Sequence, residues 1–121
     1  MMRDIKFKCW IKYQKEMHKV LSLDFVNKKA YIQADRLNKP FGFIFFDDCE
    51  LIQYTGINDY TGTEIYEGDI VLMVSMAPGG VDCEGSIEYL EGQYWISNKF
   101  GANALFNEVD SLFVVGNKYE S

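Results

Sequence analysis

The sequence has 121 residues, of which 48% are hydrophobic, and a formal net charge of -6. This length predicts a single domain over residues 1–121, enough to bury roughly two thirds of the surface of the unfolded chain. No apolar run approaches the ~20 residues that a membrane helix needs, and no secretory leader follows Met1. We therefore expect a cytoplasmic protein without a membrane partner.

The charges are distributed unevenly along the chain. Residues 1–40 hold ten basic and four acidic side chains, net +6, whereas residues 41–121 hold two lysines and fourteen acidic side chains, net -12. Two interpretations stay open. Basic and acidic strands lie side by side and neutralise each other, or two opposite patches serve self-association or a charged partner.

The first 40 residues are predicted to form a basic antiparallel β-meander. Residues 5–12 alternate apolar side chains with lysines, as in a strand with one face in the core. Residues 17–25 and 30–34 are the expected second and third strands, and residues 35–40 an expected loop. Trp10 falls among the lysines on the polar face, so it is either covered by a neighbouring element or presented to a partner.

Residues 41–46, Phe-Gly-Phe-Ile-Phe-Phe, are the most apolar hexad in the chain. We interpret them as a central strand buried on both faces, and the alternative is an exposed aromatic patch for a partner. Asp47, Asp48 and Glu50 follow directly. We interpret these carboxylates as a solvated edge, with a divalent-ion site as the weaker alternative.

The stretch Asp47–Val74 has the pattern of an architectural signature. Its segment 58–62, Asn-Asp-Tyr-Thr-Gly, predicts a hairpin turn in which Gly62 takes a left-handed conformation. Glu67-Gly68 predicts a second turn. The strand that follows, residues 69–76, is apolar on both faces and is therefore expected to be covered on both sides. Tyr60, within the first turn, is a possible partner contact.

Beyond this stretch the sequence predicts short strands joined by turns. Residues 77–82 are an expected long hairpin loop, and residues 99–107 an expected loop or single short helix. The predicted strands are 85–89, 92–96 and 111–115, with Ile87, Tyr89, Tyr94 and Ile96 available to the core. This spacing is typical of small SH3-like barrels. The predicted fold is mainly β: an antiparallel meander, then an acidic, SH3-like barrel-type sheet over 41–121, with at most one or two short helices.

No residue pattern predicts catalysis, a cofactor or a metal site. His18, the only histidine, has no serine, cysteine or paired carboxylate at motif spacing, so we interpret it as structural. Cys9, Cys49 and Cys83 are odd in number, lie far apart and form no Cys-x-x-Cys pair. They are expected to be reduced thiols rather than a disulfide or zinc framework.

Several segments together resemble the YopX protein family, small proteins of phages and prophages of Gram-positive bacteria. They are 3–10, Met17, Asp24-Phe25, 51–57, 62–71 and 115–120, so the resemblance spans nearly the whole chain. It implies a phage or prophage gene and a bacterial cytoplasm, and it implies no reaction. The central motif is expected to be structural; its members are Gln53, Tyr54, Thr55, Gly56, Gly62, Glu64, Ile65, Tyr66, Gly68 and Asp69.

The favoured function is a non-enzymatic accessory protein that binds protein, as a self-associating oligomer or through a host factor. Aromatic content, Trp10, Tyr60 and the charge polarity support this function. An acidic phage protein can also mimic DNA in a basic groove of a host enzyme. The alternative is a nucleic-acid-binding SH3-like barrel that uses the basic N-terminal segment, opposed by the net charge of the remainder. An enzyme is the third and least supported class.

Overall fold

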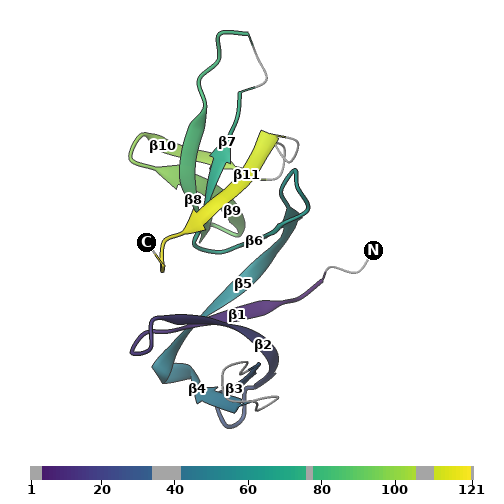
Figure 1. Cartoon of the computed structure of the whole chain (residues 1–121), viewed down its shortest axis with the longest axis vertical. Helices are drawn as coiled ribbons and strands as arrows, with labels where there is room; N and C mark the ends of the chain where they lie inside the picture. The colour runs from purple at the N-terminus through teal and green to yellow at the C-terminus, as the bar shows by residue number, and fades with distance from the viewer. Residues whose placement is uncertain (1–3, 34–41, 76–77, 106–110, 121) are drawn as a thin grey trace. The chain divides into compact units, whose positions relative to one another are not determined.

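The structure is a computed structural model that describes residues 4–33, 42–75, 78–105 and 111–120 (Figure 1). Its described residues form eleven β-strands and one short 3-10 helix, η2, over Phe46–Asp48, so the predicted mainly β fold is confirmed. The strands are β1 Phe7–Ile11, β2 Glu16–Asp24, β3 Lys29–Ile32, β4 Gly42–Phe45, β5 Cys49–Asn58, β6 Glu64–Tyr66, β7 Asp69–Met73, β8 Cys83–Leu90, β9 Gln93–Asn98, β10 Gly101–Ala104 and β11 Leu112–Asn117.

The chain divides into two compact units. The first unit comprises residues 4–53, and the second comprises residues 1–3 and 54–121, so the division falls within β5. It does not coincide with the change of charge at residue 40. Counted by unit, nine basic and seven acidic residues give the first unit +2, whereas three basic and eleven acidic residues give the second -8. A single domain over 1–121 stays a prediction.

The first unit contains the predicted meander. Strands β1, β2 and β3 pair consecutively and antiparallel, β4 joins β3, and the first half of β5 pairs with β1. Alternate residues of these strands face one side and exclude water there. The buried cluster on that side consists of Cys9, Ile11, Ala30, Ile32, Ile44 and Cys49. The expected loop at 35–40 lies outside the described residues.

The prediction that residues 41–46 form a central strand buried on both faces is wrong. Strand β4 is the last strand in the order of its sheet and pairs with β3 alone among the described strands. Its Ile44 is buried, but Phe43 is 52% exposed and Phe45 is 47% exposed. The alternation of the strand therefore places one apolar side chain in the core and leaves two rings in solvent. Residue 41 lies outside the described part of the chain.

The second unit is built on a five-stranded antiparallel sheet in the order β10-β9-β8-β7-β11. The second half of β5 pairs with β6 in the same unit. The predicted hairpin succession is present, but the described strands form an open sheet instead of a closed barrel. Its core is apolar; the buried cluster consists of Ile65, Val71, Ile87, Ile96, Leu105 and Leu112.

Three details of the second unit differ from expectation. Strand β7 is not covered on both sides: Asp69 and Val71 are buried, whereas Ile70 and Leu72 on the other face remain partly exposed. Tyr89, expected in the core, is exposed and contacts Tyr94 edge-on. Residues 101–104, expected in a loop or helix, form β10, because they pair with β9 across a tight turn. The end of that predicted segment, 106–107, lies outside the described residues.

The predicted turn glycines are confirmed. Gly62 has a φ of +89° and donates its backbone N–H to Asp59 O at 3.0 Å, as the hairpin requires. Gly68 has a φ of +81°, and its two backbone groups bond to Ile87 and Lys118. A Cβ atom at Gly68 would overlap the ring of Tyr119, whereas a Cβ at Gly62 would meet open space. The second turn therefore tolerates a side chain less well than the first.

Replacing these two glycines by alanine should give unequal losses of stability. Gly62→Ala should cost about 1 kcal/mol from backbone strain alone, and Gly68→Ala about 2 kcal/mol or more, because overlap with Tyr119 adds to the strain. Urea unfolding measures both. Gly116→Ala is the control, since Gly116 has open space and an ordinary φ. Equal losses at Gly62 and Gly68 would contradict the close approach.

Candidate binding surfaces

The carboxylate of Asp59 organises the signature turn. Although Asp59 is only 6% exposed, its Oδ1 accepts hydrogen bonds from Thr61 N and Thr63 N, both at 2.9 Å, and from Thr61 Oγ1 at 2.7 Å. Its Oδ2 accepts a fourth bond from Val114 N, at 2.9 Å, in strand β11. Burial by itself raises the pKa of this carboxyl, but the hydrogen bonds outweigh burial and hold the pKa below its ordinary value of 3.8.

Around this turn the motif residues form a second buried network. Thr55 Oγ1 donates to Ile65 O at 2.8 Å, and Tyr66 N donates to Asp69 Oδ2 at 2.8 Å. The rings of Tyr54 and Tyr66 pack with centroids 5.5 Å apart. Hydroxyl groups complete the network: Tyr54 donates to Asn58 Oδ1, and Tyr66 donates to Glu64 Oε1. Burial, then the neighbouring Glu64, raise the Tyr66 pKa.

The remaining motif residues have local roles. Gln53 lies half-buried in β5 opposite Phe7, and Gly56, with a φ of +86°, lies where the register of β5 and β6 shifts. Every motif residue is therefore placed in a strand, a turn or a hydrogen-bonded network. These contacts give the motif an architectural role.

The two predicted partner contacts differ in exposure. Trp10 is only 9% exposed, so of the two interpretations the covered indole is the one that the structure has. The alternative, in which Trp10 is presented to a partner, is wrong. Tyr60 is 64% exposed, and its ring lies 5.7 Å from that of Phe113. Sequence alternation placed Trp10 on the lysine face, but alternation does not reveal what covers that face.

An exposed aromatic surface lies on the first unit, around the apolar hexad. Lys29 and Tyr31 of β3 lie opposite Phe45 and Phe43 of β4, on the sheet face away from the buried cluster. The Phe43 ring lies 6.2 Å from Tyr31 and 5.6 Å from Phe45, between centroids, and Lys29 Nζ lies 4.4 Å from the Phe43 centroid. We call these four residues the aromatic face. The apolar hexad in the sequence already allowed an exposed aromatic patch as the alternative to a buried strand. The order of the described strands decides between them, because it places β4 at the end of its sheet.

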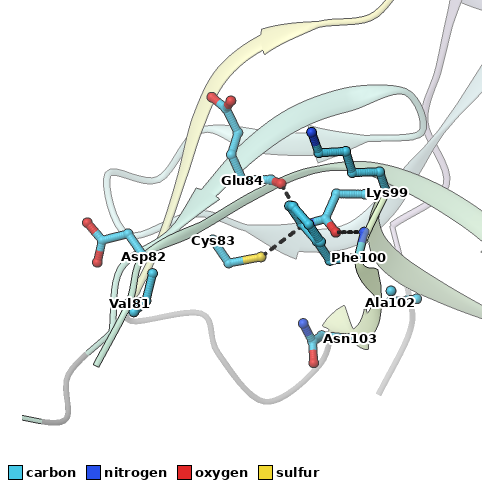
Figure 2. Close-up of a pocket in the computed structure, with 10 residues that line it drawn as sticks. Val81, Asp82, Cys83, Glu84, Lys99, Phe100, Ala102 and Asn103 are labelled. Atoms are coloured by element: carbon cyan, nitrogen blue, oxygen red, sulfur yellow. Dashed lines mark hydrogen bonds between the residues drawn. The ribbon is translucent and has the colours of Figure 1, made fainter. Parts of the chain in front are cut away.

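A second exposed feature is a cleft in the second unit, shown in Figure 2. Its volume is about 840 Å³, and its lining comes from two segments, 81–84 at the start of β8 and 98–103 around the β9–β10 turn. The Asn98 amide ties these segments together. Its Nδ2 donates to Glu84 O at 2.9 Å and to Cys83 Sγ at 3.2 Å, while Phe100 N donates to Asn98 Oδ1 at 2.8 Å.

Groups capable of chemistry are dispersed over the described residues. His18 lies with Nε2 3.1 Å from Glu16 Oε2 and Nδ1 3.3 Å from Gln33 O, in contacts that hold its ring. No three histidine, cysteine or acidic side chains gather into a potential metal site within the described ranges. A search of the same residues finds no helix long and apolar enough to cross a membrane.

The three cysteines are free, in agreement with the sequence prediction. Burial, followed by the nearby Cys49, raises the Cys9 pKa from 9.0 to about 12. Burial also raises the pKa of Cys49. Cys83 is half-buried in the lining of the cleft. Two thiols are therefore held in a core, and the third lies beside a surface feature.

These features define a small, mainly β protein with two exposed candidate surfaces. The family model described as YopX protein matches residues 6–121, so the chain belongs to this family. A similar fold occurs in the crystal structure of protein EF1440 from Enterococcus faecalis, with a TM-score of 0.65 and 22% identity over 98% of this chain and 96% of that one. No curated protein matches the chain.

Replacing the Asp59 carboxylate should destabilise the protein in a pH-dependent way. Asp59→Asn should cost about 1–3 kcal/mol at pH 7, because the buried donors lose their charged acceptor. The pKa of this carboxyl is lowered by folding, so its contribution is present above about pH 4 and is lost as the pH falls through the folded value. Urea unfolding should therefore show that the difference in free energy of unfolding between wild type and Asp59→Asn is smaller at pH 3 than at pH 7.

An exposed aspartate provides the control for this experiment. Asp47→Asn, in η2, should change stability by no more than about 0.5 kcal/mol. A gap between wild type and Asp59→Asn that is the same at pH 7 and pH 3 would show that the carboxylate is not the group that these donors stabilise.

Thiol labelling should separate the three cysteines. At pH 8 a thiol reagent should modify Cys83 first, and should reach Cys9 and Cys49 only after unfolding, because thiolate is the reactive form and burial suppresses it. Mass spectrometry identifies the modified site. Equal rates at all three positions would contradict the buried placement of Cys9 and Cys49.

Proposed function

We propose that this YopX family protein is a phage- or prophage-encoded accessory protein that acts in the bacterial cytoplasm, without catalysis, by binding protein. The family match gives it relatives and a fold, and assigns no reaction. The partner is a host protein, a second copy of the chain, or both. The observation that carries this proposal is the aromatic face at the β4 edge.

The aromatic face has the properties of a protein-binding surface. Phe43 and Phe45 expose about half of their surfaces next to Tyr31, and aromatic rings dominate the anchors of protein interfaces. Strand β4 also ends its sheet, among the strands that the structure describes. An edge strand can accept an extended segment of another chain through its backbone groups.

Charge narrows the kind of segment that fits. Lys29 belongs to the aromatic face and follows Lys28 in the sequence; its Nζ lies near two of the rings, 4.4 Å from the Phe43 centroid and 5.6 Å from the Phe45 centroid. An extended segment with apolar side chains on alternate residues and acidic ones between them would meet both rings and lysines. The acidic second unit supports a different contact, with a basic groove of a host enzyme that ordinarily holds DNA.

Nucleic-acid binding is the second candidate function. Its specific support is the combination of clustered, exposed rings and Lys29 on one sheet face, since single strands bind through base stacking on aromatic side chains beside cations. The net charge of -6 opposes it, because most of the molecule would repel phosphates. Protein binding therefore remains the proposal.

The aromatic face can be removed without touching the core. Phe43→Ser with Phe45→Ser should leave the melting temperature nearly unchanged and reduce capture of a host partner at least about tenfold, because the anchor rings are lost. Capture on immobilised protein, followed by mass spectrometry, measures this loss. Phe25→Ser is the control, since Phe25 is an exposed ring outside the aromatic face. Equal capture by wild type and the double variant would contradict a role for this face.

The nucleic-acid alternative is tested in parallel. Fluorescence anisotropy with duplex and single-stranded oligonucleotides at about 50 mM salt should show no binding, since the acidic charge opposes polyanions. Micromolar or tighter binding that is abolished by Lys6→Glu, Lys8→Glu and Lys12→Glu together would overturn the proposal in favour of the alternative. If Phe43→Ser with Phe45→Ser also abolished oligonucleotide binding, the bases would be assigned to the rings of the aromatic face.

A further inference from the structure

We propose that copies of this protein associate head to tail, with the β1–β2 hairpin tip of one copy seated in the cleft of the next. The hairpin tip consists of residues 12–15, Lys-Tyr-Gln-Lys. The cleft is the one lined by 81–84 and 98–103 in the second unit. This inference makes the self-association arm of the proposed function specific, and it uses a surface other than the aromatic face.

The cleft offers apolar contact area that is already held in shape. Val81 and Phe100, in its lining, are each 87% exposed, so both have most of their surface left to bury. The bonds of Asn98 Nδ2 to Glu84 O and Cys83 Sγ join the two lining segments, and the bond from Phe100 N to Asn98 Oδ1 holds the turn within the second segment (Figure 2). A cleft whose lining segments are tied together loses less conformational freedom when it is filled.

The hairpin tip has the complementary form. The pair Ile11 and Glu16 closes the hairpin, so the four tip residues are held at the end of two paired strands. Tyr13 is 72% exposed, and Lys12 and Lys15 on either side of it are also exposed. An exposed ring between two cations at the end of a hairpin is a suitable anchor for an apolar cleft with an acidic rim.

Charge favours this pairing over others. Asp82 and Glu84 are exposed residues of the segment 81–84, and their carboxylates point outward at the rim of the cleft (Figure 2), where Asp82 Oδ1 accepts a hydrogen bond from Ser75 N at 3.0 Å. The second unit as a whole has a net charge of -8. The lining also contains one cation of its own chain: Lys99 Nζ lies over the Phe100 ring, 5.1 Å from its centroid. The ring of Tyr13 can therefore pack on the apolar lining while Lys12 and Lys15 meet the two carboxylates.

The geometry of the contact has a consequence for the assembly. Tip and cleft are different surfaces, so the pair that forms first still carries one free tip, on one copy, and one free cleft, on the other. Such heterologous contacts build rings when the rotation closes, or open chains when it does not. Association should therefore continue beyond two copies and should weaken as salt is raised, because exposed charges are screened over ~10 Å at 0.1 M.

Charge reversal on each side separately provides the test. Variant A carries Lys12→Glu with Lys15→Glu, and variant B carries Asp82→Lys with Glu84→Lys. Each variant alone pairs a tip and a cleft of like charge, so both should remain at 14.0 kDa in light scattering at low salt, under conditions where wild type is larger. An equimolar mixture of A and B should associate again, because the acidic tip of A fits the basic cleft of B and the unaltered tip of B fits the unaltered cleft of A.

Two further variants and a labelling measurement distinguish this contact from unspecific attraction between charged surfaces. Glu88→Lys with Glu91→Lys makes the same change of charge outside the cleft and should leave association unchanged. Tyr13→Ser, which keeps both lysines, should weaken association at least about tenfold through loss of the ring. Labelling of Cys83 should slow in the assembled wild type and recover in variant A, since the hairpin tip covers the cleft.

Clear outcomes overturn the inference. Wild type at 14.0 kDa at low salt and high concentration would remove self-association altogether. Variants A and B that associate as wild type does, or an A and B mixture that stays monomeric, would remove this contact. Phe43→Ser with Phe45→Ser should assemble normally, so loss of partner capture and loss of tip-to-cleft assembly are measured independently.

Discussion

A buried carboxylate is the constraint on which the second unit depends. Asp59 accepts four hydrogen bonds, three from its own turn and one from Val114, 55 residues further along the chain. A charge with so little exposure is tolerable only when donors replace the water that it lost. The turn and strand β11 must therefore reach their places together, because either one alone leaves the carboxylate incompletely bonded.

The central motif and the two exposed candidate surfaces are different parts of the chain. The motif residues around Tyr54 and Tyr66 form turns, packed rings and hydrogen bonds. The aromatic face lies before it in β3 and β4, and the cleft lies after it. The motif consequently accounts for local architecture, and the partner that we propose would bind surfaces outside it.

Charge acts differently at these two surfaces. The first unit has a net charge of +2 because seven acidic side chains, three of them in η2 and β5, offset most of its nine basic ones, and the second unit has -8. Lys29 beside the rings favours an acidic segment at the aromatic face, and Asp82 with Glu84 favours a basic one at the cleft. In the assembly that we propose, the complementary pair is the hairpin tip and the cleft, and such complementarity selects orientation more than it adds affinity.

The sequence by itself determined the mainly β class, the meander, the turn at Gly62 and the free thiols, because period-2 alternation and turn glycines are local properties. Tertiary structure decided that β4 is an edge, that Trp10 is covered, and that residues 101–104 pair as a strand. It also joined Asp59 to Val114 and brought 81–84 beside 98–103. These features depend on which strands become neighbours, and alternation along one strand carries no information about its neighbours.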